Sequence, residues 1–178
     1  MYAITFAAAA IIWPFIVAMF SSKYGVDVSA RFLERLGNIP STGKELTPRS
    51  FEKWLRSPDN GPFRRPYGYL IMFLDIFYIA LVGGFFVSAS LWLVGALTWP
   101  EPAAWWPFCV LVCILPAVYI ISDFVEDTLI TLSLRRDDVN DNMFRVMRSA
   151  TTIKIWSFGA AAAQTVLLGL GALLLSAA

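Results

Sequence analysis

Four long apolar segments divide this chain, at about residues 1–20, 69–99, 107–134 and 155–176. A helix needs about 20 apolar residues to cross a hydrocarbon layer of roughly 30 Å, and it satisfies its own backbone hydrogen bonds there. The pattern therefore predicts an all-α, polytopic membrane protein. We expect a single membrane domain over residues 1–178, folded as a four-transmembrane-helix bundle.

Two features within the spans bear on how they pack. Small residues recur at every fourth position of the second and fourth spans, and such spacing lets helix backbones approach closely in lipid. A compact bundle is the first interpretation, and a homodimer face is the alternative. Proline interrupts the first span at position 14 and the third at position 116, and we expect each to kink its helix.

The first polar connection, at about residues 21–68, carries two short amphipathic patterns. The second of them follows Thr47-Pro48, an N-cap followed by proline at the first helical position. We expect two short helices on the inner leaflet, with docking on a partner subunit as the alternative. Their apolar faces comprise Phe32, Leu33 and Leu36 in one and Phe51, Trp54 and Leu55 in the other.

The two shorter connections are expected to be turns. The second polar connection, at about 135–154, places Asn142 as the N-cap of a helix that continues into the fourth span. Between the second and third spans, the Trp- and Pro-rich segment 99–107 predicts a turn in an interfacial aromatic belt. A binding platform for a partner or ligand is the alternative interpretation of this segment.

Charge gives the spans a direction. Only 15% of residues are charged, against about 25% in soluble domains. All 14 Lys and Arg residues lie in the two polar connections. The positive-inside rule therefore predicts that both connections are cytoplasmic, in the inner membrane, with both termini on the non-cytoplasmic side. The first span lacks a basic n-region, so we expect it to be retained rather than cleaved.

Composition also excludes much chemistry. The chain has no histidine, so haem is not expected, and Ser-His-Asp or Cys-His catalysis cannot operate. Cys109 and Cys113 stand in a Cys-x-x-x-Cys spacing within one span, which favours packing over a disulfide. We expect no cofactor, no metal and no nucleic-acid partner, while a bound lipid is compatible with the sequence. A protein without catalytic activity is the favoured interpretation.

The remaining candidates for chemistry are charged residues inside the spans. Isolated charges there cost several kcal/mol, so pairing or protonation is expected. Helical spacing puts three acids on one broad face of the third span, near the level at which a lysine enters the fourth. We expect this lysine to pair with Asp123 or Glu126. The polar cluster comprises Asp75, Asp123, Glu126, Asp127 and Lys154.

Two functions fit these features. The first hypothesis is a non-enzymatic accessory or scaffold subunit of a larger membrane complex, with the lipid bilayer and a partner subunit or a second copy as its partners. In it the polar cluster is an ion pair that fixes helix register. The alternative is a small transporter or a proton or cation conduit, in which the same carboxylates and Lys154 form a relay.

Overall fold

The computed structural model describes residues 2–23, 47–58, 61, 69–70, 72–97, 102–136 and 140–176. Its main elements are the helices α1 (Tyr2–Lys23), α4 (Pro48–Arg56), α6 (Met72–Ala96), α7 (Pro102–Arg136) and α8 (Asp141–Ser176). All of these except α4 are long and apolar enough to cross a bilayer. In the part of the chain that the structure describes, the all-helical prediction is confirmed, and the four long apolar helices fit the predicted multi-pass membrane protein.

The third and fourth long helices extend beyond the spans expected from sequence. Helix α7 begins at Pro102 rather than near Pro107, so Trp105 and Trp106 belong to its first turns instead of a loop. Proline fits this position because the first turn of a helix has no intrahelical acceptor for its N–H. The helix then runs for 35 residues, or about 52 Å, which exceeds the hydrocarbon thickness.

The N-cap of α8 is Asn140 rather than Asn142. The Oδ1 atom of Asn140 accepts a hydrogen bond of 2.7 Å from the backbone N–H of Met143, three residues later. Asn142 is the second residue of α8, and its Oδ1 atom instead accepts a hydrogen bond of 2.7 Å from Nη2 of Arg145. The continuous helix expected between the second polar connection and the fourth span is present, and it extends over 36 residues.

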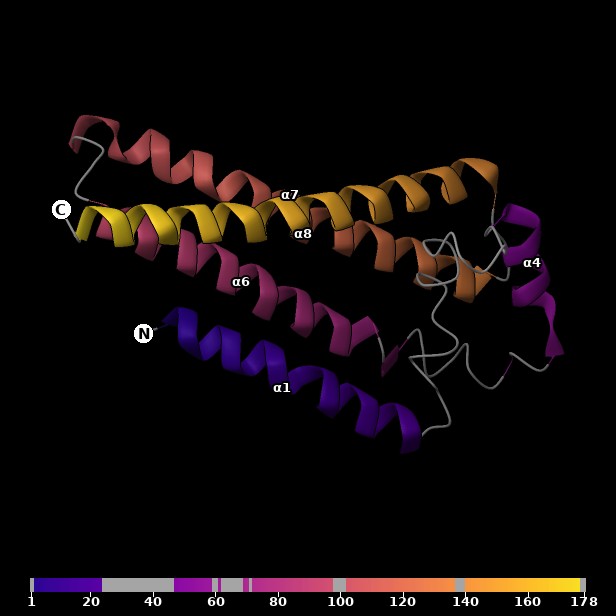
Figure 1. Cartoon of the computed structure of the whole chain (residues 1–178). Helices are drawn as coiled ribbons and strands as arrows, with labels where there is room; N and C mark the ends of the chain where they lie inside the picture. The colour runs from indigo at the N-terminus through magenta and orange to yellow at the C-terminus, as the bar shows by residue number, and fades with distance from the viewer. Residues whose placement is uncertain are drawn as a thin grey trace.

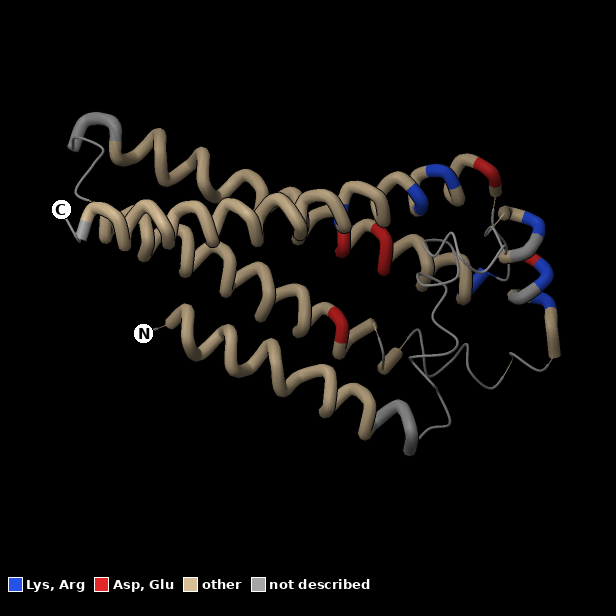
Figure 2. The backbone as a smooth tube through the Cα atoms, viewed as in Figure 1, with Lys and Arg blue, Asp and Glu red and all other residues tan. Residues whose placement is uncertain are grey.

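Helices α6, α7 and α8 pack against one another, and α1 packs mainly against α6 (Figure 1). The start of α1 and the end of α8 lie at the same end of the packed helices, here called the terminal end. At the other end α7 finishes, α8 begins and α4 lies across them. We call this the basic end, because it carries Arg135, Arg136, Arg145 and Arg148 (Figure 2).

Two adjacent glycines let side chains of two different neighbouring helices approach α6 closely. A Cβ atom on Gly83 would collide with the Ile120 side chain of α7. On Gly84 it would lie 2.9 Å from the ring of Phe6 on α1. On the same interface, near the start of α6, Trp13 Nε1 donates a hydrogen bond of 2.7 Å to the carbonyl oxygen of Leu74. Packing of the Phe6 ring on Gly84 and one partly buried hydrogen bond thus hold α1 to α6.

Helix α4 packs on the protein through its apolar face. Phe51 and Leu55 are completely buried, and the ring of Phe51 lies 6.4 Å from that of Phe144 on α8. The charged face points away, with Arg49, Lys53 and Arg56 exposed. At these two apolar positions the neighbours are side chains of the same chain. The Trp54 side chain and the pattern with Phe32, Leu33 and Leu36 lie outside the described residues.

Candidate functional site

Three helices bring the charged residues of the spans to one level. Asp75 lies in the first turn of α6, and Lys154 lies on α8, one turn after Thr151. The acids of α7 occupy positions 123, 126 and 127, so helical periodicity directs them toward both neighbours. Figure 2 shows acidic bands of α6 and α7 close to one another, on the side of the bundle nearer the basic end.

Lys154 bridges two acids of α7. Its Nζ atom lies 2.7 Å from Oδ1 of Asp123 and 2.6 Å from Oε2 of Glu126. The other Glu126 oxygen accepts a hydrogen bond from the hydroxyl of Thr151, one turn before Lys154. Glu126 is therefore held at both oxygens by α8, and it is only 1% exposed. Removing any one of these partners would leave a buried carboxylate poorly compensated.

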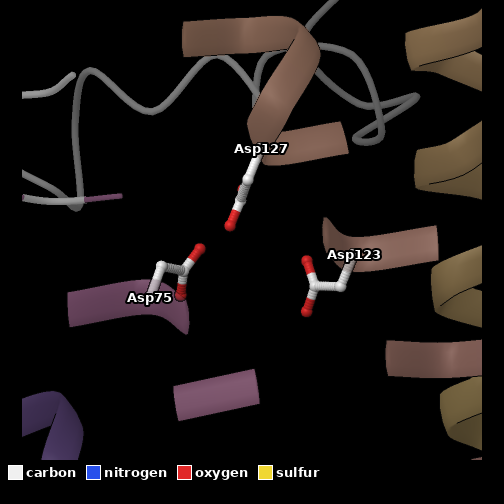
Figure 3. Close-up of side chains that lie close together, drawn as sticks. All are labelled: Asp75, Asp123 and Asp127. Carbon is white, nitrogen blue, oxygen red and sulfur yellow. The ribbon is translucent and has the colours of Figure 1, made fainter. Parts of the chain in front are cut away.

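Three aspartates form the other side of the cluster. Each of Asp75, Asp123 and Asp127 offers a carboxylate oxygen within 4.8 Å of those of the other two. Figure 3 shows the three side chains converging on a common space, Asp75 from α6 and the others from α7. Carboxylates this close repel one another, so a bound positive charge would stabilise the arrangement.

Acids outnumber bases in this cluster. Among the described residues, four carboxyl groups, at positions 75, 123, 126 and 127, lie near one ammonium group, that of Lys154. All three acids of α7 are buried, each with at most 4% of its surface exposed. Charge buried without a counter-charge is expensive in an apolar interior. Bound protons or a bound cation can supply the missing positive charge, and an all-oxygen donor set suits hard cations such as Mg²⁺ or Ca²⁺.

The structure adds two neighbours that charge patterning could not indicate. Thr151 donates to Glu126, and Tyr119 lies one helical turn before Asp123 on α7. Both are uncharged residues of kinds that also occur widely in membrane helices without a functional role. The only available signal was their spacing: Tyr119 precedes Asp123 by four residues, and Thr151 precedes Lys154 by three.

A second polar group lies farther toward the terminal end. Nε2 of Gln164 on α8 donates to the hydroxyl oxygen of Ser90 on α6, at 3.1 Å, and to the carbonyl oxygen of Val112 on α7, at 2.7 Å. Ser90 is completely buried. Nearby, Cys109 and Cys113 are free thiols, and Cys109 packs with Val94 and Val112 in an apolar cluster.

Comparisons with known proteins find no match: no family model, no curated protein and no solved structure is similar to this chain. The functional argument therefore starts from the geometry of the two polar groups. The larger group joins a part in which Lys154 and Thr151 hold Glu126 to a part in which the carboxylates of Asp75, Asp123 and Asp127 converge. A positive charge can bind where the three carboxylates converge.

Proposed function

We propose that the protein is a small ion-coupled membrane protein that takes up a proton or a small cation at the aspartates 75, 123 and 127. The observation that carries this proposal is the convergence of the Asp75, Asp123 and Asp127 carboxylates, which offer oxygen atoms within 4.8 Å of one another next to the contact between Lys154 and Asp123. Carboxylate oxygens gathered in this way are ligands for a proton or a hard cation.

The arrangement suggests a division of roles. Lys154 and Thr151 hold Glu126 in one position. Asp123 forms an ion pair with Lys154 and also lies next to the carboxylates of Asp75 and Asp127. An incoming cation or proton would compete with the Lys154 ammonium for Asp123. The competition supplies a physical link between ion uptake on one side of α7 and the contact between α7 and α8 on the other.

Ion uptake can be tested on the purified protein in detergent. Infrared spectra should contain a protonated carboxyl band that is lost in Asp75→Asn or Asp127→Asn. If the site binds a cation instead, titration with NaCl, MgCl₂ or CaCl₂ in weak buffer should release protons from the wild type. The two variants should release none. The matched control is Asp141→Asn, which alters an exposed acid in the first turn of α8. If neither a protonated carboxyl nor a cation-dependent proton release is found, the proposal is wrong.

We also infer that the basic end faces the cytoplasm and both termini face the opposite side of an inner membrane. The support is the distribution of Lys and Arg, all 14 of which lie in the two polar connections. Ions would then reach the cluster from the cytoplasmic side, since the charged residues lie nearer the basic end than the terminal end.

An accessory subunit of a larger membrane complex is the second candidate. The arrangement of α1 favours it, because α1 packs mainly against α6 and exposes large apolar side chains such as Tyr2, Ile4 and Phe15. A second membrane helix can pack there as well as lipid can. Purification in mild detergent from the native host tests this candidate. A stoichiometric partner would support it, and a chain that elutes alone at all concentrations would contradict it.

A further inference from the structure

An exposed row of aromatic rings follows α6 from the basic end into its membrane-spanning part. Tyr69, just before α6, is 71% exposed, and Phe73 and Phe77 are 58% and 46% exposed. The three residues are four apart, which places them near one face of the helix. The Phe73 and Phe77 rings meet edge to face with centroids 5.1 Å apart, and the Phe77 ring lies 5.5 Å from that of Trp13 on α1. The row, which we call the aromatic row, is therefore a continuous apolar surface.

A cationic group stands at the basic end of the aromatic row. The guanidinium carbon of Arg135, near the end of α7, lies 5.2 Å from the centre of the Tyr69 ring. A guanidinium group stacked on an aromatic face keeps the N–H groups at its edge available for an anion. Arg135 and its neighbour Arg136 are both exposed. An apolar surface that ends in exposed cations matches an amphiphile with apolar chains and an anionic head.

Helix geometry places Arg135 at the level of lipid headgroups. Trp106, in the first turns of α7, is 72% exposed and is of the residue type that marks a membrane interface. A hydrocarbon layer of roughly 30 Å corresponds to about 20 helical residues, so its other edge lies near Glu126. Arg135 is about 14 Å farther along the helix. Helical side chains lean toward the N-terminus, which for α7 is toward the bilayer, so the guanidinium group can reach lipid phosphates.

The arginines of α8 lean in the opposite direction. This helix begins at the basic end, so its side chains lean away from the bilayer. Nη2 of Arg145 accordingly donates a hydrogen bond of 2.7 Å to Oδ1 of Asn142, toward the start of the helix. Arg135 and Arg145 therefore carry the same charge at the same end of the protein, but only Arg135 leans toward the membrane. The pair can distinguish a defined lipid site from general attraction to an anionic membrane.

We propose that an anionic phospholipid binds on this surface, with its phosphate at Arg135 and Arg136 and an acyl chain along Phe73 and Phe77. Arginine forms paired, charge-assisted hydrogen bonds with phosphate oxygens. A second copy of the chain fits the surface less well. In a two-fold pair the same patch of each copy meets the other, so arginines of like charge would approach one another. The lipid site does not depend on ion uptake at the aspartates.

The test is native mass spectrometry of the purified protein in detergent, titrated with phosphatidylglycerol or with phosphatidylethanolamine of the same acyl chains. The wild type should hold one phosphatidylglycerol and bind phosphatidylethanolamine more weakly, because the latter headgroup has no net charge. Arg135→Gln should weaken phosphatidylglycerol binding about tenfold, since it removes charge-assisted hydrogen bonds. Phe73→Ala should weaken the binding of both lipids, because it removes a contact with the acyl chain. Equal affinity of the wild type for both lipids would contradict an anionic site.

Two matched variants separate the site from nonspecific effects. Arg145→Gln removes the same charge from α8, and Phe15→Ala removes a ring that is 73% exposed on α1. Both should bind phosphatidylglycerol as the wild type does. If Arg145→Gln weakens binding as much as Arg135→Gln, the attraction is general and the proposal is wrong. Size-exclusion elution and circular dichroism establish that each variant is folded.

Other occupants of the surface would give different results. If millimolar glycerol phosphate displaces the bound lipid, the ligand is a soluble phosphate compound and the lipid proposal is wrong. A dimer that forms without lipid and is lost in Phe73→Ala would assign the aromatic row to a second copy, which also overturns the proposal. Neither result bears on ion uptake, which is measured separately with Asp75→Asn and Asp127→Asn.

Discussion

The side-chain amide of Gln164 donates a hydrogen bond of 2.7 Å to the carbonyl oxygen of Val112. In a regular helix this carbonyl would accept the N–H of the residue four positions later, but that residue is Pro116, which has no N–H. Gln164 therefore replaces the bond that the proline removes from α7. Because the same amide also reaches Ser90, one side chain joins three helices at the proline position.

Replacing Gln164 by Leu should destabilise the protein by about 1–2 kcal/mol, because it leaves the buried Val112 carbonyl without a donor. The loss should be smaller in a Pro116→Ala background, where residue 116 again supplies a backbone N–H. A double-mutant cycle on unfolding in mixed micelles measures the difference. Equal losses in both backgrounds would mean that the amide contributes through packing rather than through the freed carbonyl.

Gly83→Ala should destabilise the contact between α6 and α7 by about 1–3 kcal/mol, the usual cost of overpacking. The new methyl group would collide with Ile120, whose β-branched side chain has few alternative rotamers. Thermal unfolding in detergent is the measurement. Gly95→Ala is the matched control on the same helix, because nothing lies within 4 Å of its Cβ position, and it should unfold at the wild-type temperature or above.

Apolar run length was enough to predict the four long helices, because a backbone in lipid has few alternatives to helix. The boundaries were less predictable. Asn140 and Asn142 are both good N-cap residues, and the choice between them depends on which side chain meets the N–H three residues later. Similarly, the Trp-rich segment reads as a turn, but proline at position 102 can begin a helix as readily as proline at position 107 can.

The candidate site was only partly predictable for a similar reason. Charge in an apolar run marks Asp75, Asp123, Glu126, Asp127 and Lys154 directly. The rotation of each helix about its own axis, which decides that Asp123 faces both Lys154 and Asp75, is a property of the packed bundle.

Lys154→Met should destabilise the protein by about 3–5 kcal/mol, since it leaves Asp123 and Glu126 buried without their counter-charge. Neutralising both acids in the same chain, with Asp123→Asn and Glu126→Gln, should recover much of the loss. Unfolding in mixed micelles measures both effects. Lys53→Met, on the exposed face of α4, is the control and should change little. A triple variant no more stable than Lys154→Met would contradict the pairing.

Phe51→Ala should release α4 from the basic end, because this ring is completely buried and contacts Phe144. Hydrogen exchange of the amides in residues 48–56 should then become faster, while exchange in the core of α6 stays slow. Lys53→Ala alters only the exposed face and should leave α4 protected. If Phe51→Ala changes exchange only when lipid is present, α4 is held by the bilayer rather than by α8.

Cysteine labelling should locate the two ends of the bundle on opposite sides of the membrane. In a chain with Cys109 and Cys113 replaced by Ala, a new cysteine at exposed Tyr2 should react with an impermeant maleimide on intact cells, provided that the outer membrane is permeabilised. A cysteine at exposed Arg145 should react only after the inner membrane is opened. The expectation follows from the confinement of Lys and Arg to the two polar connections. Labelling at position 145 with the inner membrane intact would reverse the orientation, and ions would then enter the carboxylate cluster from the outer side.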